Sequence, residues 1–248
     1  MLLKVLTYNI HRAIGVDRRF RPSRIVEILA HHDADVALLQ EVDEGAPRSR
    51  ELDLARDLGR EAGYPHVAAG YNVSLRKGRY GNAILSRWPL TIHRNIDLTV
   101  DERKRRGCLH ARVRIEKAHH GVHELDVFNL HLGLSARERT RQVGTLVRSP
   151  EFAGAPEGAP CLVAGDFNDW RAQLVPIFVE ILQFKSATRH RFGYQTAIRT
   201  YPSFSPTGAL DKIFFRGPLR LLGARSCRLR VSRVASDHLP IVAEFELG

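Results

Sequence analysis

The sequence contains little cysteine and no long apolar run. Its three cysteines, Cys108, Cys161 and Cys227, are an odd number without the spacing of a metal site. They argue against a disulfide framework and predict buried free thiols in a reducing compartment. No run approaches the roughly 20 apolar residues of a membrane helix, and the apolar stretch at the amino terminus is too short for a signal peptide. These absences predict a soluble, cytoplasmic protein without a transmembrane segment.

Internal repeats, low-complexity tracts and long flexible linkers are also lacking. A chain of 248 residues with 44% hydrophobic residues can bury one large core, so we expect residues 1–248 to form a single domain. The 38 basic and 27 acidic residues give a net charge of +11. This excess is compatible with nucleic acid, an acidic membrane surface or a small phosphoester, and equally with solubility alone. Nothing in the sequence implies a protein partner.

The most informative stretch is Leu162–Asp169. An apolar run that ends in glycine and alternating polar residues predicts a buried strand with Asp166 and Asn168 at its carboxyl end, where open α/β sheets place their chemistry. Residues two apart in a strand point the same way, so these two would face one pocket while Phe167 packs behind them. The alternative is a helix start, with Asn168 or Asp169 capping the segment that follows.

Polar side chains also end the first two predicted strands. Strands predicted at residues 2–10 and 34–39 flank a helix predicted at residues 22–31. If the two strands are parallel neighbours, Asn9 and Glu41 lie at the same edge of the sheet. A carboxylate that follows an apolar run this closely needs a partner such as a metal ion or a base.

Later strands end in the same way. His131 follows a strand predicted at residues 122–130. Asp211 lies in another predicted strand among apolar neighbours, and therefore needs a hydrogen-bonded partner. We expect that partner just before the last predicted strand, where Asp237 and His238 stand side by side.

The charged run at residues 101–106 precedes a predicted strand. Most of it is typical of a solvated loop. Arg106, beside a glycine at the strand start, is the better candidate for binding phosphate, because a guanidinium can bind two phosphate oxygens at once. Upstream of this run, the strand predicted at residues 80–86 is expected to pair with residues 91–98 across a Trp-Pro turn.

These candidates form a chemically consistent set. Carboxylate and amide oxygens suit a hard divalent cation such as Mg²⁺ or Mn²⁺, whereas zinc would favour more histidine or cysteine. Histidines suit proton transfer and charge stabilisation near neutral pH. The combination predicts metal-assisted hydrolysis of a phosphoester. The full set is Asn9, Glu41, His131, Asp166, Asn168, Asp211, Asp237 and His238.

The same segments resemble the motifs of the endonuclease/exonuclease/phosphatase superfamily of metal-dependent phosphoesterases, and in particular its small bacterial members. The resemblance implies an α/β fold like that of DNase I, a four-layer sandwich of two mixed β-sheets packed face to face with helices outside and the site at one end. In family order, the matching segments are TYN (7–9), LQEV (39–42), GNAILSR (81–87), NLH (129–131), GDFNDWR (165–171), LDKI (210–213) and SDH (236–238).

The resemblance also implies a metal site. Glu41 would be the principal ligand of Mg²⁺ or Mn²⁺, and Asn9 and Asp237 would help to hold the ion or its waters. Whether one ion or two are bound is left open.

Catalytic roles follow from the resemblance as well. Asp166 would orient or deprotonate the attacking water, and Asn168 would steady the phosphate. His238, oriented by Asp211, would contact the phosphate oxygens together with His131.

The leading functional hypothesis is a divalent-metal phosphodiesterase acting on nucleic acid, a phospholipid or a small phosphodiester. The alternatives are a phosphomonoesterase similar to the inositol phosphatases and a non-catalytic basic scaffold that binds nucleic acid. The QEV and GDFN segments resemble the lipid, inositol-phosphate and poly(A)-nuclease branches more than the apurinic branch. The tyrosine that apurinic endonucleases place near the phosphate has no counterpart between Arg94 and Ala118.

Overall fold

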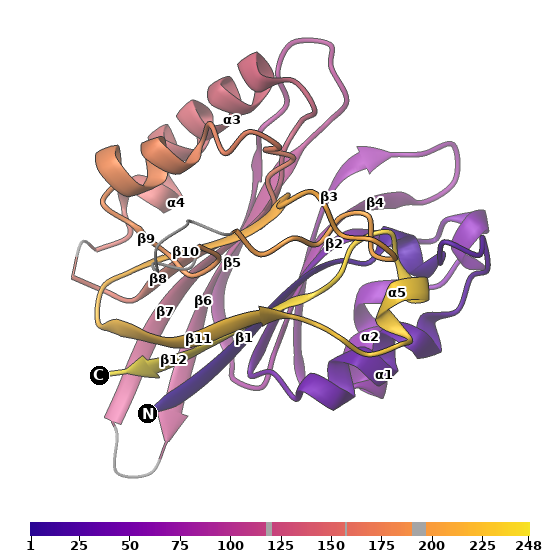
Figure 1. Ribbon diagram of the computed structural model, residues 1–248, viewed down its shortest axis with the longest axis horizontal. Coiled ribbons are helices and arrows are strands. Elements are labelled where there is room, and N and C mark those ends of the chain that lie inside the picture. Colours follow the sequence, from indigo (N-terminus) through magenta and orange to yellow (C-terminus); the bar gives the residue numbers. More distant parts are fainter. Residues whose placement is uncertain (118–120, 157, 190–196) are drawn as a thin grey trace.

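Two β-sheets face each other in the computed structural model, which describes residues 1–117, 121–156, 158–189 and 197–248 (Figure 1). Within these residues, each sheet contains six strands. The first sheet has the order β11-β12-β1-β2-β4-β3, and the second has the order β5-β6-β7-β8-β10-β9. Both are mixed, because β1–β2 and β7–β8 are parallel while the other pairs are antiparallel.

The two sheets draw on different parts of the chain. The strands of the first sheet are β1 (Leu2–Asn9), β2 (Val36–Glu44), β3 (His66–Ser74), β4 (Arg79–Ser86), β11 (Leu219–Ser226) and β12 (Ile241–Leu247). The strands of the second sheet are β5 (Leu90–Asp97), β6 (Gly107–Lys117), β7 (Gly121–His131), β8 (Cys161–Asp166), β9 (Lys185–Ser186) and β10 (Asp211–Arg216).

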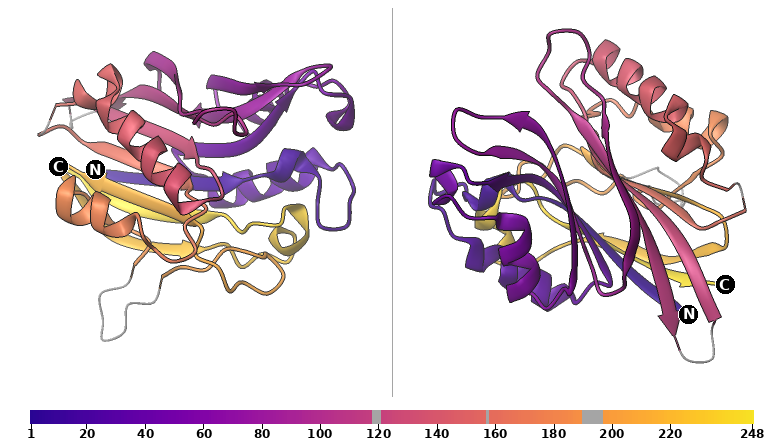
Figure 2. Two further views of the ribbon diagram at one scale, coloured as in Figure 1. Left: turned by 90° about the horizontal axis from the view of Figure 1, so that it is seen from above. Right: turned by 180° about the vertical axis from the view of Figure 1, so that it is seen from behind.

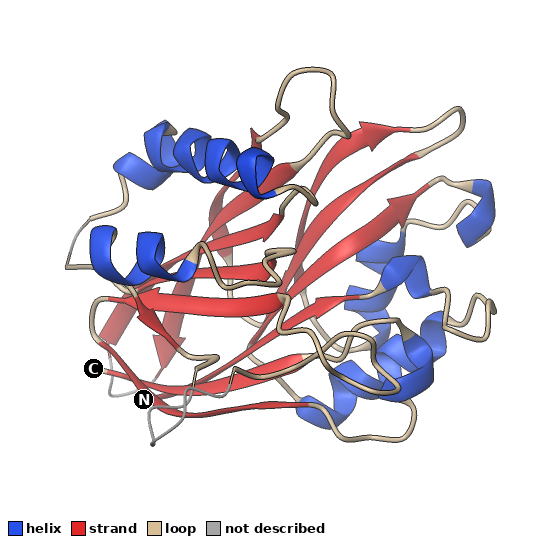
Figure 3. Ribbon diagram, turned by 45° about the horizontal axis from the view of Figure 1, so that its top comes forward, coloured by secondary structure: helices blue, strands red, loops and turns tan. Residues whose placement is uncertain are grey.

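Helices cover the outer faces of both sheets (Figures 2 and 3). The helices are α1 (Pro22–His32), α2 (Leu54–Glu61), α3 (Ala136–Arg148), α4 (Pro150–Ala153) and α5 (Ser232–Ala235), with single turns η1 (His11–Ala13), η2 (Pro47–Ser49) and η3 (Ile177–Ile181). One apolar core lies between the sheets, a second lies under α1 and α2, and a third lies under α3 and η3. The predicted four-layer sandwich is therefore confirmed.

The parallel pair in each sheet brings polar strand ends together. The register aligns His131 of β7 with Asp166 of β8, and antiparallel β10 begins with Asp211 opposite the same Asp166. Gly165 makes this approach possible, because its φ is +139° and a Cβ atom there would lie 2.0 Å from the carbonyl oxygen of Leu130. Any larger residue would push β8 away from β7 one residue before the site.

Buried amides hold the two sheets in register behind the site. Asn129 of β7 is fully buried, and its Nδ2 donates to the carbonyl oxygens of Leu39 and Ala83 at 2.9 and 2.8 Å. Its Oδ1 accepts a hydrogen bond of 2.7 Å from Nε2 of Gln40. A side chain of the second sheet thus satisfies backbone groups of two strands in the first, which fixes the offset between the sheets at this end.

Strand β2 extends further than the sequence indicates. It was expected to end near residue 39, but it continues to Glu44 through a bulge between Gln40 and Val42. Glu41 occupies the bulge with φ of +56°. The extra residue lets the strand keep its pairing with β4 while Glu41 turns out of the ladder. Glu41 therefore lies inside a strand, and the prediction that it follows a strand end is wrong.

The predicted hairpin between residues 80–86 and 91–98 is also wrong. Strand β4 pairs with β2 and β3, whereas β5 pairs with β6 in the second sheet. Both edges of β4 are already occupied, so the chain after Ser86 crosses to the other sheet.

All three cysteines are buried and free, as expected. Among the described residues, no helix combines the length and apolar character needed to cross a membrane.

His32 in the last turn of α1 predicts a loss of stability in acid. Its ring is buried, Nε2 has no hydrogen-bond partner within the described residues, and burial together with nearby His31 lowers the pKa of the imidazole to about 4. In the unfolded chain the His32 imidazole takes up a proton near pH 6.5, whereas in the folded chain it does so only near pH 4. Between pH 7 and about pH 4.5, this difference should lower the free energy of unfolding by about 2 kcal/mol.

Urea denaturation at both pH values, for the wild type and His32→Gln, checks this expectation. Glutamine does not titrate, so the variant should lose about 2 kcal/mol less on acidification than the wild type. Equal losses in the two proteins would show that His32 does not contribute.

Candidate active site

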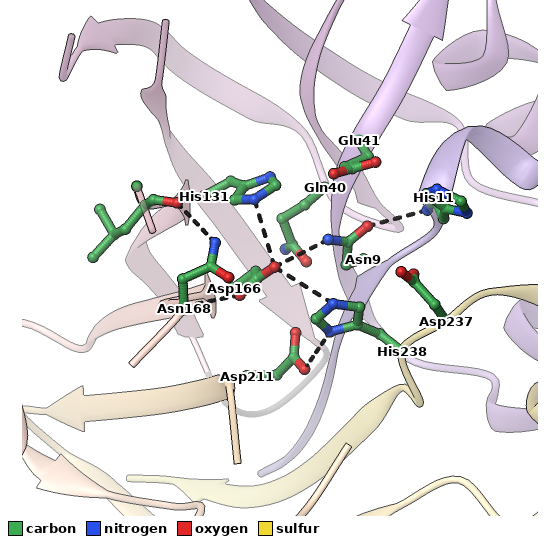
Figure 4. A network of polar contacts seen from close by, with 12 residues as sticks. Asn9, His11, Gln40, Glu41, His131, Asp166, Asn168, Asp211, Asp237 and His238 are labelled. Atoms are coloured by element: carbon green, nitrogen blue, oxygen red, sulfur yellow. Dashed lines mark hydrogen bonds and ion pairs between the residues drawn. The ribbon is translucent and has the colours of Figure 1, made fainter. Parts of the chain in front are cut away.

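Asp166 lies at the centre of a polar cluster at the end of β8 (Figure 4). Its side chain is buried, and its Oδ2 accepts a hydrogen bond of 3.0 Å from Nδ2 of Asn9. Its Oδ1 accepts from the backbone N–H of Asn168 at 2.9 Å, and Nδ2 of Asn168 donates to the carbonyl oxygen of Leu132 at 2.9 Å. The carboxylate is therefore held by donors on two sides in one orientation.

Two histidines approach the same oxygen of Asp166. Nε2 of His131, at the end of β7, lies 3.5 Å from Oδ2, and Nε2 of His238, just before β12, lies 3.7 Å from it. Both rings are buried. Residues far apart in the sequence thus converge on one carboxylate oxygen from both sheets.

Asp211 orients His238. Its Oδ2 lies 2.8 Å from Nδ1 of His238 and also accepts a hydrogen bond from the hydroxyl of Thr200. An ionised carboxylate only accepts, so Nδ1 carries a proton and Nε2 faces Asp166. The partner of Asp211 is therefore His238, which lies just before the last strand, where the sequence pattern predicted a partner.

The site separates the protonation states of its two histidines. Burial lowers the pKa of His131 well below its usual value, and the positive charge of Arg106 lowers it further. Burial also opposes protonation of His238, but Asp211 and Asp166 outweigh it and raise the pKa of that imidazole to about 10. Burial, with Asp211 nearby, raises the pKa of Asp166. Near neutral pH, His238 is a cation and His131 is neutral.

Asp169 has a different role from Asp166 and Asn168. Its Oδ1 and Oδ2 accept hydrogen bonds of 2.9 and 3.0 Å from the backbone N–H groups of Gln173 and Leu174. Asp169 thus caps the turn that follows, while the two preceding polar residues belong to the site. The strand interpretation of residues 162–169 holds for the segment that ends at Asp166, and the capping interpretation holds for Asp169.

Glu41 presents an oxygen that no hydrogen bond uses. Its Oε2 is buried, without a hydrogen-bond partner in the described part of the chain, and lies 3.6 Å from Nε of Arg12. Figure 4 shows Asn9 between Glu41 and Asp237. Asp237 is partly exposed, and its Oδ1 accepts from the hydroxyl of Ser236 at 3.3 Å. Two carboxylates and an amide therefore surround the end of β1.

A second group has metal-ligand geometry. Ligand atoms of Asp166, Asp211 and His238 lie within 4.8 Å of one another. Within the described residues, both groups contain a buried carboxylate oxygen without a hydrogen-bond partner, Oε2 of Glu41 and Oδ1 of Asp211. The second group includes an imidazole nitrogen that is already bound to Asp211, whereas Glu41, Asn9 and Asp237 offer oxygen donors, which suit a hard cation better.

Arg106 stands apart from the rest of the charged run. It is buried, while Arg103, Lys104 and Arg105 are exposed. The next residue, Gly107, pairs with His131 across β6 and β7. The structure thus places Arg106 close to the site, in a pocket that His131 also lines.

Comparison of the sequence with known protein families shows the family of this chain. The model of the Endonuclease/Exonuclease/phosphatase family matches residues 6–238. The chain belongs to this family. The matched span runs from β1 to His238 and includes every residue of the cluster around Asp166. The endonuclease/exonuclease/phosphatase resemblance seen in the sequence is confirmed, and the chain is a phosphoester hydrolase of that family.

Known proteins match over nearly the whole chain. The uncharacterized protein YbhP of Escherichia coli K12 is 32% identical over 253 residues, which cover 98% of this chain and 96% of that protein. A family structure from Beutenbergia cavernae has a TM-score of 0.79 at 20% identity, covering 100% of this chain and 72% of that one. The mannosyl-6-phosphatase Bt3783 of Bacteroides thetaiotaomicron has a TM-score of 0.75 at 19% identity, covering 99% and 100%.

Two residues of the site were not anticipated from the sequence. Arg12 follows the end of β1 by three residues, so the argument that neighbouring strand ends meet would have placed it beside Glu41. Thr200 reaches Asp211 from an irregular loop, and no pattern in the sequence indicates that contact.

Proposed function

We propose that this chain is a divalent-metal-dependent phosphodiesterase. The observation that carries the proposal is the convergence on Oδ2 of Asp166, where a hydrogen-bonded amide lies at 3.0 Å and two histidine nitrogens lie at 3.5 and 3.7 Å. A buried carboxylate with proton donors of different charge on either side can orient a water molecule and accept its proton. Glu41, with Asn9 and Asp237, would hold Mg²⁺ or Mn²⁺.

The side chains of the site have separate roles in the proposed reaction. When bound, the cation would supply charge neutralisation at the phosphate and a more acidic water. Asp166 would hold the attacking water and accept its proton. The imidazolium of His238, fixed at Nδ1 by Asp211, directs Nε2–H toward the phosphate oxygens, where negative charge builds up. His131 and Asn168 contact the remaining oxygens.

Space on two sides of the cluster favours a diester over a monoester. Beyond His238, the ring of Tyr201 lies 5.0 Å away, and it contacts Trp170, whose side chain is 56% exposed. Beyond His131, a polar pocket opens beside Arg106. A diester has an organic group on each side of phosphorus, and each side of this site offers a surface for one.

The proposal predicts that metal removal abolishes hydrolysis. With Mg²⁺ or Mn²⁺, the protein should hydrolyse bis-p-nitrophenyl phosphate faster than p-nitrophenyl phosphate. Excess EDTA should reduce the rate at least about a hundredfold, and added metal should restore it. Faster hydrolysis of the monoester would instead support a phosphomonoesterase, and activity that survives EDTA would contradict the proposed mechanism.

Glu41→Gln tests the metal site directly. The variant should weaken Mn²⁺ binding, measured by calorimetry, by about tenfold or more, because it removes the charged oxygen. Glu44→Gln is the matched control, since Glu44 lies on the same strand but pairs with Arg79. Equal affinities in the two variants would place the cation elsewhere, with the Asp166–Asp211–His238 group as the next candidate.

A further inference from the structure

Arg106 is a buried cation that has no counter-ion in the part of the chain that the structure describes. Its side chain is 6% exposed, its Nε has no hydrogen-bond partner, and it forms no ion pair with any acidic residue of the described chain. Its backbone groups are hydrogen-bonded, since the N–H donates to Oγ1 of Thr99 at 3.3 Å and the carbonyl oxygen accepts from the N–H of Leu98 at 2.9 Å. Burying a guanidinium without an anion is strongly unfavourable. A bound anion would remove this penalty.

The small pocket beside Arg106 has a lining whose charge favours an anion. It is lined by Asn72, Asn82, Arg105 and His131 as well as Arg106, and no carboxylate faces it. The amide of Asn72 can donate to an anion through Nδ2. The Asn72 amide lies directly over Gly107, where a Cβ atom would come within 2.1 Å of it. The glycine lets the amide and the guanidinium occupy the same small space.

His131 connects this pocket to the catalytic cluster. It lines the pocket and also lies 3.5 Å from Oδ2 of Asp166. Gly107, the first residue of β6, is the cross-strand partner of His131, and Arg106 immediately precedes it. A group bound by Arg106 would therefore sit next to a phosphate at Asp166, on the His131 side.

We propose that Arg106, with Arg105 and Asn72, forms a subsite for a second phosphate of the substrate, next to the phosphoester that is cleaved. The inference rests on the proposed function and sharpens it, because it specifies a substrate with two neighbouring phosphates. Arg106 binds two oxygens of the second phosphate through its fork of N–H groups, and exposed Arg105 adds a charge at the mouth of the pocket.

Two chromogenic esters that differ in one phosphate test the subsite. These are the 4-nitrophenyl ester of thymidine 5′-phosphate and the same ester with an added 3′-phosphate. With Mn²⁺, the wild type should show a kcat/KM at least about tenfold higher for the 3′-phosphorylated ester, through a lower KM. Arg106→Met keeps the apolar stem and removes the charge, and it should bring the ratio of the two kcat/KM values close to one.

Arg94→Met is the matched control, because Arg94 is exposed on β5 and its removal lowers the net charge equally. It should keep the wild-type ratio. Three results would overturn the subsite: no preference in the wild type, an equal loss on both esters in Arg106→Met, or the same loss of preference in Arg94→Met. An equal loss on both esters would assign Arg106 to the cleaved phosphate instead.

Binding separates failure of the subsite from failure of the proposed activity. If the wild type cleaves neither ester, the proposed function fails, and the subsite is then measured by calorimetry with thymidine 3′,5′-bisphosphate and thymidine 5′-phosphate in EDTA. The bisphosphate should bind at least about tenfold more tightly, and only in proteins that retain Arg106. Arg106→Met should also melt at the wild-type temperature or above it without ligand, since it removes an unpaired buried charge. A lower melting temperature, together with equal affinities, would mean that Arg106 is purely structural.

Discussion

Asp166→Asn should lower kcat/KM for bis-p-nitrophenyl phosphate about a thousandfold or more, which corresponds to about 4 kcal/mol of transition-state stabilisation. The amide has the shape of the carboxylate but cannot take a proton from water. It also turns an NH₂ group toward Asn9 or toward the backbone N–H of Asn168, both of which donate to the carboxylate. The variant therefore loses both the base and its orientation.

The fold should survive this substitution. Burial raises the pKa of Asp166, so its charged form is held at a cost to stability. Asparagine removes that cost, and the melting temperature should equal or exceed that of the wild type. Asp97→Asn, at the exposed end of β5, is the control and should keep full activity. A loss of less than about tenfold in Asp166→Asn would rule out a central role for this carboxylate.

His238→Ala should reduce kcat/KM by about a hundredfold to a thousandfold. The substitution removes the imidazolium that faces the phosphate and leaves Asp211 and Asp166 close together without the cation between them. Asp211→Asn should have a smaller effect, because the ring remains but loses its orientation at Nδ1. The expected order of activity is wild type, then Asp211→Asn, then His238→Ala.

Steady-state kinetics of these variants with bis-p-nitrophenyl phosphate give the comparison. His93→Ala removes an exposed histidine of β5 and serves as the control. If Asp211→Asn were as inactive as His238→Ala, Asp211 would contribute more than orientation. Wild-type activity in His238→Ala would exclude this histidine from the reaction.

The sequence predicts this site well because its residues follow apolar runs. Strand ends are visible in the pattern, and parallel neighbours bring their ends to one edge, so Asn9, His131 and Asp166 could be expected to lie close together. Glu41 shows the limit of this reasoning. Its bulge requires a positive φ at a glutamate, and no propensity or periodicity indicates that.

Strand partners were harder to predict than strands. The pattern at residues 80–98 fits a hairpin as well as it fits two strands in different sheets. The outcome depends on β3, which was not predicted because its glycine and alanines weaken the strand signal, and which takes the free edge of β4. The contacts of Asn129 across the sheets depend on the same assembly and have no local signature.

A nascent chain of this protein should have no activity before His238 has been synthesised. Strand β12 lies between β1 and β11, so the outer edge of β1 stays unpaired until β12 has been made. The second sheet, built from residues 90–216, can form earlier, but it carries only part of the site. His238 leaves the ribosome just before β12, and pairings this distant in sequence form late. Phosphoester cleavage is thereby delayed until both sheets have formed.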